Sequence, residues 1–180
     1  MVNMFGLLSI LGGVWGLRLT STHFGIFVIF AAIYAAGTLG IGRPEIGGVV
    51  VKVGEIFSPL VALFGMASVI GLVFGQFVAN SASPLGPMDM ASPVVSFAGL
   101  LAIWYLRRRM VVAGVLAYVV ITSLWLAFLL SLNMRMGYGE ALGPAFLSQL
   151  AAVVIGYAIY KVLRRVGPFK ERRAEAVQVS

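Results

Sequence analysis

Residues 67 to 91 read ASVIGLVFGQFVANSASPLGPMDMA and join an apolar segment to a polar turn. Small side chains recur at every fourth position of this stretch, at Ala67, Gly71, Gly75, Ala79 and Ser83. On a helix such positions form one row, which lets the backbone of a neighbouring helix approach closely inside lipid. The spacing therefore predicts a packing face on a membrane helix.

Polar side chains occur beside this row, and the stretch then breaks. Ser68, Gln76 and Asn80 lie one step around the same predicted helix, and Asp89 follows a turn rich in proline and glycine. Polar groups inside a bilayer are costly unless they have partners or a function. We therefore expect this part of the chain to carry chemistry as well as packing.

The composition identifies an integral membrane protein. Of 180 residues, 61% are hydrophobic and only 11% are charged, which is outside the range of soluble domains. The long apolar runs show no alternation with period two, so they predict helices rather than a closed barrel. At about 20 residues a span there is room for about six helices. We predict a single all-α membrane domain, a six-transmembrane-helix bundle.

Several classes of protein are excluded by what the sequence lacks. No P-loop pattern is present, the chain has no cysteine, and one histidine cannot build a histidine metal cluster. Neither a serine nucleophile with a histidine partner nor a cluster of metal-binding carboxylates occurs within the spans. We expect no enzyme, no catalytic residue and no metal site. The net charge of +7 indicates cytoplasmic loops rather than nucleic-acid binding.

The predicted bundle extends over residues 24 to 163. We expect residues 1 to 20 to form an N-terminal interfacial extension, or an extension of the first helix, and residues 164 to 180 to form a basic tail. We expect spans at residues 24 to 41, 88 to 106, 110 to 132 and 141 to 163, with a loop at 42 to 56. Pro59 and Gly65 divide residues 57 to 83 into two helices that join near 65 to 67. A single unbroken helix there would leave five spans.

The basic residues orient the bundle. The tail and Arg107, Arg108 and Arg109 belong on the cytoplasmic side by the positive-inside rule, which makes both termini cytoplasmic in a plasma-membrane protein. The connections 42 to 56, 84 to 88 and 133 to 140 then face outward. All four acidic residues before the tail lie at that outer face, which predicts a polar pocket open to the outside.

The candidate pocket residues are carboxylates and amides that reach down from the outer face: Glu55, Asn80, Asp89, Gln76 and Gln149. Each has a simpler alternative. Asp89 is also suited to capping a helix, and Glu55 to ending a loop. Asn80 and Gln76 are suited to hydrogen bonds between helices.

Three segments resemble the queuosine-precursor transporters of the QueT family, which are substrate-binding S-components of energy-coupling factor (ECF) transporters. The segments are FAAIYAAGTLGI at 30 to 41, VKVGEIFSPL at 51 to 60 and GLVFGQFVANSASPLGPMD at 71 to 89. The resemblance covers residues 28 to 106. The sequence departs from the family pattern at Gly54, where a serine is common, and at Gln76, where small or sulphur-containing residues are usual.

The resemblance implies a deazaguanine precursor of queuosine, or of the related archaeal base, as cargo. A guanine-like edge offers N–H donors and an acceptor oxygen, which a carboxylate such as Glu55 or Asp89 and the amide of Asn80 would read. Lys52 belongs to the matching motif, and Tyr138 would stack on the ring. The alternatives are a carrier of another planar metabolite or vitamin and a structural partner in a membrane complex.

The resemblance also implies partners, because an S-component has no motor of its own. These are a transmembrane coupling subunit and two ATPase subunits, which use the ATP, so the chain itself needs no cofactor. The docking face would be the small residues of the first span: Ala31, Ala32, Ala35 and Ala36. Spacing alone favours an ordinary helix contact within the chain for these alanines.

Overall fold

The computed structural model describes residues 20–41, 45–46, 49–50, 52–83, 85–134 and 136–166. Its elements, in chain order, are α2 (Ser21–Gly40), β1 (Glu45–Ile46), β2 (Val49–Val50), η1 (Val53–Leu60), α3 (Val61–Phe64), α4 (Met66–Asn80), η2 (Pro87–Ala91), α5 (Ser92–Leu106), α6 (Val111–Met134) and α7 (Tyr138–Leu163). The two short strands pair antiparallel. The predicted extension at 1 to 20 lies almost entirely outside the described residues, as does the tail beyond residue 166.

The described chain is otherwise helical, and four of its helices are long and apolar enough to cross a membrane. They are Ser21–Gly40, Pro87–Leu106, Val111–Met134 and Tyr138–Leu163. The two other helical stretches, Val53–Phe64 and Met66–Asn80, are apolar but shorter. The predicted all-α membrane class is therefore confirmed, whereas two of the predicted spans are shorter than a full crossing requires.

The predicted division of residues 57 to 83 is confirmed at Gly65. This glycine has φ of +77°, a left-handed conformation that ends α3 and begins α4. The boundary of the preceding loop was wrong, because η1 begins at Val53 and includes Glu55. Apolar side chains between Val53 and Leu60 pack against the bundle, and their burial favours a helix over an exposed loop.

The row of small residues on α4 packs against α2. A Cβ atom at Gly71 would lie 2.5 Å from the carbonyl oxygen of Phe27, and one at Gly75 would lie 2.5 Å from that of Ala31. The two backbones are thus as close as the sequence predicts. Ala31 belongs to this internal contact, whereas Ala32 and Ala36 are exposed on α2.

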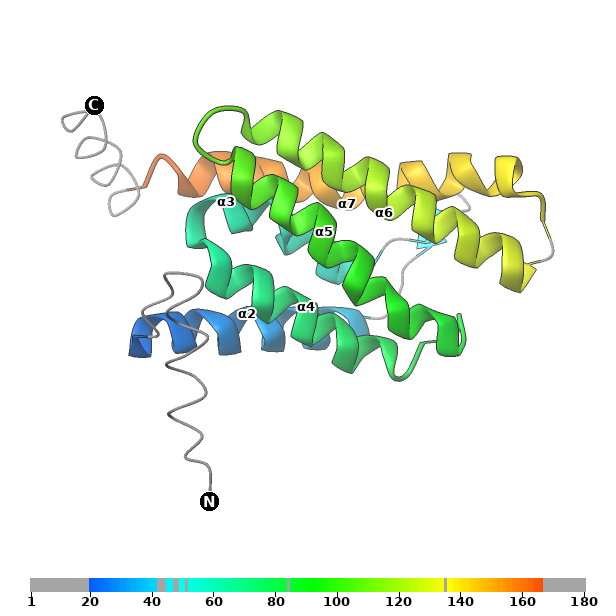
Figure 1. Ribbon diagram of the computed structural model, residues 1–180, viewed down its shortest axis with the longest axis horizontal. Coiled ribbons are helices and arrows are strands. Elements are labelled where there is room, and N and C mark those ends of the chain that lie inside the picture. The colour runs from blue at the N-terminus through cyan, green and yellow to red at the C-terminus, as the bar shows by residue number, and fades with distance from the viewer. Residues whose placement is uncertain are drawn as a thin grey trace, which may run out of the picture.

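The connections between helices separate the two ends of the molecule (Figure 1). The β1–β2 hairpin, the turn between α4 and α5, and the approach to α7 lie at one end. The turn of Arg107, Arg108 and Arg109 lies at the opposite end, together with the C-terminal end of α7. The connections that carry Glu45, Asp89 and Glu140 are therefore at the end opposite the arginines, as the charge pattern predicts, whereas Glu55 lies inside the bundle on η1.

Candidate functional site

A buried carboxylate lies at the centre of the bundle. Glu55 on η1 is 2% exposed, and Tyr34 Oη donates to its Oε1 at 2.9 Å. Tyr118 Oη donates to Oε2. Longer bonds of 3.4 Å come from Ser58 Oγ to Oε2 and from Gln76 Nε2 to Oε1. Each of these four partners donates a hydrogen, so the two carboxylate oxygens act as acceptors in this arrangement.

Three different helices bring these donors together. Tyr34 comes from α2, Gln76 from α4 and Tyr118 from α6. Gly54 makes the approach of α2 possible, because a Cβ atom there would lie 2.8 Å from the ring of Tyr34. Gly54 therefore has a clear packing role here.

An ion pair lies beside the carboxylate. Lys52 Nζ is 3.2 Å from Asp89 Oδ1 and 3.5 Å from Oδ2, and both side chains are buried. Ser83 and Ser92 donate their hydroxyls to the same carboxylate. Asn80 Nδ2 donates to the main-chain oxygen of Asp89 at 2.8 Å, so it fixes the turn that presents the acid.

A tryptophan is connected to this ion pair through a hydroxyl. Trp125 Nε1 on α6 donates to Ser92 Oγ at 2.7 Å, and Ser92 in turn donates to Asp89. The orientation of the indole is thereby tied to the position of the buried acid.

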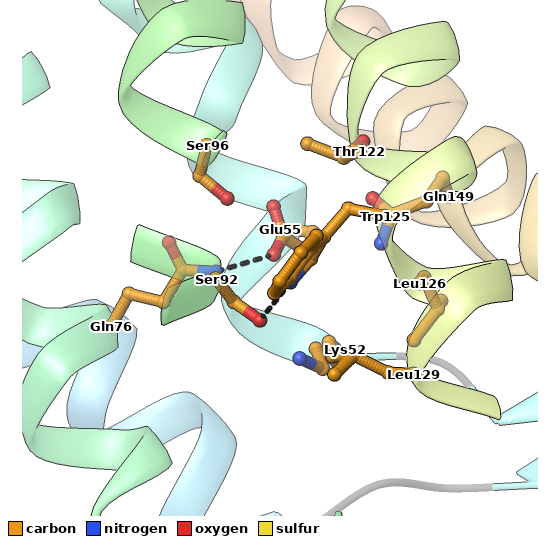
Figure 2. A pocket seen from close by; sticks show the side chains of 10 residues that line it. All are labelled: Lys52, Glu55, Gln76, Ser92, Ser96, Thr122, Trp125, Leu126, Leu129 and Gln149. Atoms are coloured by element: carbon orange, nitrogen blue, oxygen red, sulfur yellow. Dashed lines mark hydrogen bonds between the residues drawn. The ribbon is translucent and has the colours of Figure 1, made fainter. Parts of the chain in front are cut away.

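A polar cavity lies between these groups (Figure 2). Its volume is about 10 Å³, and it is lined by Lys52, Glu55, Gln76, Ser92, Ser96, Thr122, Trp125, Leu126, Leu129 and Gln149. Gln76, Ser92 and Ser96 approach Glu55 from one side, and Thr122, Trp125 and Gln149 lie on the other (Figure 2). This is room for about one water molecule, so a larger ligand requires side chains of the lining to move.

One acceptor in the cavity wall is unused. Gln149 is 3% exposed, and its Oε1 has no hydrogen-bond partner in the part of the chain that the structure describes. A buried carbonyl oxygen without a partner is costly. A ligand with a suitably placed N–H would satisfy it.

The structure brings together most of the residues that the sequence singled out. Lys52, Glu55, Gln76 and Gln149 line the cavity. Asn80 and Asp89 lie one layer behind it, where they hold Lys52 and the turn.

Tyr138 is the exception among the predicted site residues. Its side chain is 43% exposed and its hydroxyl donates to the carbonyl oxygen of Leu124 at 3.2 Å. It does not line the cavity, because it begins α7 at the outer surface. Trp125 supplies the aromatic surface instead.

The sequence analysis did not identify four polar or aromatic residues that line the cavity, Thr122 and Trp125 on α6 and Ser92 and Ser96 on α5. It also did not identify Tyr118 on α6, which bonds to Glu55. Their spacing offered a signal, since residues three or four positions apart share one face of a helix. Polar and aromatic side chains at such intervals in two apolar helices indicate a common inward face.

The comparison with protein families shows to which family the chain belongs. The family model described as QueT transporter matches residues 26–165. The chain belongs to the QueT transporter family. The searches of curated proteins and of solved structures found no match. The QueT family is a family of transport proteins rather than enzymes, and among the described residues of this QueT transporter no group of three or more metal-binding side chains occurs.

Proposed function

We propose that this QueT transporter is the substrate-binding S-component of an ECF-type importer and that its cargo is a 7-deazaguanine precursor of queuosine or archaeosine. The observation that supports this most strongly is the buried Glu55 carboxylate in a compact polar cavity with one aromatic wall. Binding sites of this kind combine apolar walls with a few polar groups that fix orientation.

The cavity offers a complementary group for each part of such a base. Adjacent N–H donors of a guanine-like edge pair with Glu55, in exchange for one of its tyrosine donors. A further N–H satisfies Gln149 Oε1, which has no partner in the described chain. The ring stacks on Trp125, whose indole is held by its bond to Ser92.

Three of the predicted site residues shape the cavity in this proposal and do not stack on the cargo: Asn80, Asp89 and Lys52. Asn80 and Asp89 hold the turn that begins α5, and Lys52 is held by Asp89 at the cavity wall. Tyr138 remains a candidate for contact at the outer surface only, since it lies outside the cavity lining.

The proposed membrane arrangement follows the positive-inside rule. The arginine end, Arg107 to Arg109, faces the cytoplasm with both termini, and the Lys52–Asp89 end faces outward. In this bundle the shorter stretches Val53–Phe64 and Met66–Asn80 cross together with the four longer helices, which gives the six-helix S-component arrangement.

ECF-type import uses ATPase subunits, and this chain carries no P-loop pattern of its own. We place the coupling subunit on the exposed alanines of α2, Ala32 and Ala36, with Ala35 half-buried beside them. Ala31 contributes through its contact with α4. Two ATPase subunits complete the transporter and use the ATP.

Native mass spectrometry of the freshly purified protein tests the cargo. We expect a bound molecule with the mass of a 7-deazaguanine, and binding of the same compound by isothermal titration calorimetry. Gln149→Leu removes the unused acceptor and should weaken binding about tenfold, which corresponds to about 1.4 kcal/mol. Ser131→Ala is the control, because the Ser131 hydroxyl bonds only to its own helix at an exposed position.

The same preparation separates the alternatives. Binding of a different planar metabolite, with the same dependence on Gln149, would change the proposed cargo but support the proposed carrier function. Absence of any small-molecule ligand, with substitutions in the cavity changing stability alone, would favour a structural partner in a membrane complex. Co-purification of ATPase subunits would support the ECF assignment, and ligand binding without them would indicate a solitary carrier.

A further inference from the structure

An apolar groove lies between α6 and α7 and shares no lining residue with the polar cavity. Its volume is about 140 Å³, and its lining consists of valines, leucines and one tyrosine. Val119 and Val153 are buried and form its floor, whereas Val112, Leu116 and Val154 are half or more exposed along its rim. An apolar space of this size takes up hydrocarbon rather than water. For a protein in a bilayer, the available hydrocarbon is a lipid acyl chain.

The groove follows the axes of the two helices. Its lining on α7 extends from Leu150 to Tyr157, two turns of helix or about 10 Å. Its lining on α6 extends from Val112 to Val119. Helices that cross a bilayer run within a moderate tilt of the membrane normal, and so do acyl chains. A lipid chain and this groove therefore have the same direction.

The groove ends beside positive charge. Lys161 follows Tyr157 by one turn of α7, and its Nζ lies 5.2 Å from the centre of the Tyr157 ring, which belongs to the lining. The rings of Tyr157 and Tyr160 stack with their centres 5.5 Å apart, and the guanidinium of Arg164 lies 6.0 Å from the centre of Tyr160. Two cations are thus held on a pair of tyrosines where the apolar lining ends.

The charge at this end of the molecule is positive among the described residues. Lys161 and Arg164 are exposed at the same end as the turn of Arg107 to Arg109 (Figure 1). The described acidic residues belong to the opposite end or, for Glu55, to the interior of the bundle. Basic pockets between membrane helices are suited to anionic lipid headgroups.

From this junction of groove and cations we infer that the α6–α7 groove binds an anionic phospholipid, with one acyl chain in the groove and the phosphate beside Lys161. A zwitterionic lipid fills the groove equally well, but it carries its own positive charge and gains less from Lys161. The site goes beyond the proposed function, because neither the cargo nor the ECF partners enter the argument.

Native mass spectrometry of the delipidated wild-type protein in detergent tests the site. Phosphatidylglycerol and phosphatidylcholine with the same acyl chains are added in equal amounts, and the bound lipids are distinguished by mass. Phosphatidylglycerol should bind about fivefold more tightly, which is the scale of one basic side chain near an anionic headgroup. Equal affinities would overturn the inference and leave the proposed carrier function standing.

Removal of one charge tests the position of the headgroup. Lys161→Gln should reduce the preference for phosphatidylglycerol to about twofold or less. Arg108→Gln is the matched control, because it removes the same charge at the same end from the exposed turn between α5 and α6. Equal reductions in the two variants would show a response to overall charge and would overturn the site beside Lys161.

A bulky side chain tests the position of the acyl chain. Val154→Phe places a ring in the groove and should weaken binding of both lipids at least about threefold. Val120→Phe is the control, since Val120 is 49% exposed on α6 outside the lining, compared with 57% for Val154. Equal lipid binding by the two variants would overturn the groove as the acyl-chain site. The wild-type comparison needs no substitution, so it tests the lipid preference independently of how the variants fold.

Discussion

The hydroxyl of Tyr118 donates to Oε2 of Glu55, although 63 positions separate the two residues in the chain. Tyr118 is 1% exposed and lies within α6, whereas Glu55 lies on the short helix η1. Tyr34 of α2 donates to the other oxygen. The carboxylate is therefore positioned by two helices that are distant in sequence, and its hydrogen bonds help to hold them together.

Removal of one of these donors should destabilise the protein. Tyr118→Phe leaves a buried carboxylate oxygen with weaker partners, so we expect the free energy of unfolding to fall by about 1–3 kcal/mol. Thermal and denaturant unfolding in detergent would measure the loss. Tyr105→Phe is the control, since Tyr105 is 80% exposed. Equal stabilities of the two variants would contradict a structural role for the Tyr118–Glu55 bond.

The Lys52–Asp89 pair should show strong coupling. Lys52→Met removes the ammonium that lies 3.2 Å from Asp89 Oδ1, and we expect a loss of about 3–5 kcal/mol in unfolding free energy. Addition of Asp89→Asn to this variant should restore part of that loss, because it removes the carboxylate charge that Lys52 neutralised. A double-mutant cycle on unfolding free energies measures the coupling. If the two losses were simply additive, the ion pair would contribute nothing of its own.

Two glycines of α7 should respond differently to the same change. A Cβ atom at Gly156 would collide with the carbonyl oxygen of Ile56 on η1, whereas one at Gly139 would meet nothing within 4 Å. Gly156→Ala should therefore cost about 1–3 kcal/mol or more through overpacking. Gly139→Ala should leave stability unchanged or raise it by up to about 1 kcal/mol. Unfolding in detergent compares them directly, and equal effects would argue against close packing of α7 on η1.

The exposed alanines of α2 test the proposed docking face. Ala32→Leu with Ala36→Leu adds bulk at exposed positions, so stability and ligand affinity should change little. If the coupling subunit packs there, recovery of ATPase subunits in a pull-down should fall at least about tenfold. The matched control is Val112→Leu with Val120→Leu, at exposed positions of α6. Equal recovery with both double variants would place the docking face elsewhere.

Much of the fold was predictable because its causes are local. The break at Gly65 requires a residue that tolerates φ of +77°. The row that includes Gly71 and Gly75 marks a close helix contact by its spacing alone. The sequence did not show that the partner of this row is α2, because every apolar helix of the chain offers a comparable surface.

The candidate site was predictable in part. Glu55, Gln76 and Gln149 stand out because polar side chains in apolar segments need a reason. Tyr118 and Trp125 do not stand out, since aromatic residues are common in membrane helices and most frequent near the interfaces. The start of η1 was misplaced because its helix is stabilised by burial against other elements rather than by its own residues.

The amino-acid sequence by itself determined that this chain is a helical membrane protein with its acidic turns and its arginine turn at opposite ends, since hydropathy and charge act on each segment separately. Only the tertiary structure decided which helix faces point inward. Lipid tails are as apolar as the side chains, so an apolar residue has about the same free energy whether it faces the bilayer or another helix. That choice places Tyr34 and Tyr118 on Glu55 and puts Trp125, rather than Tyr138, at the cavity wall.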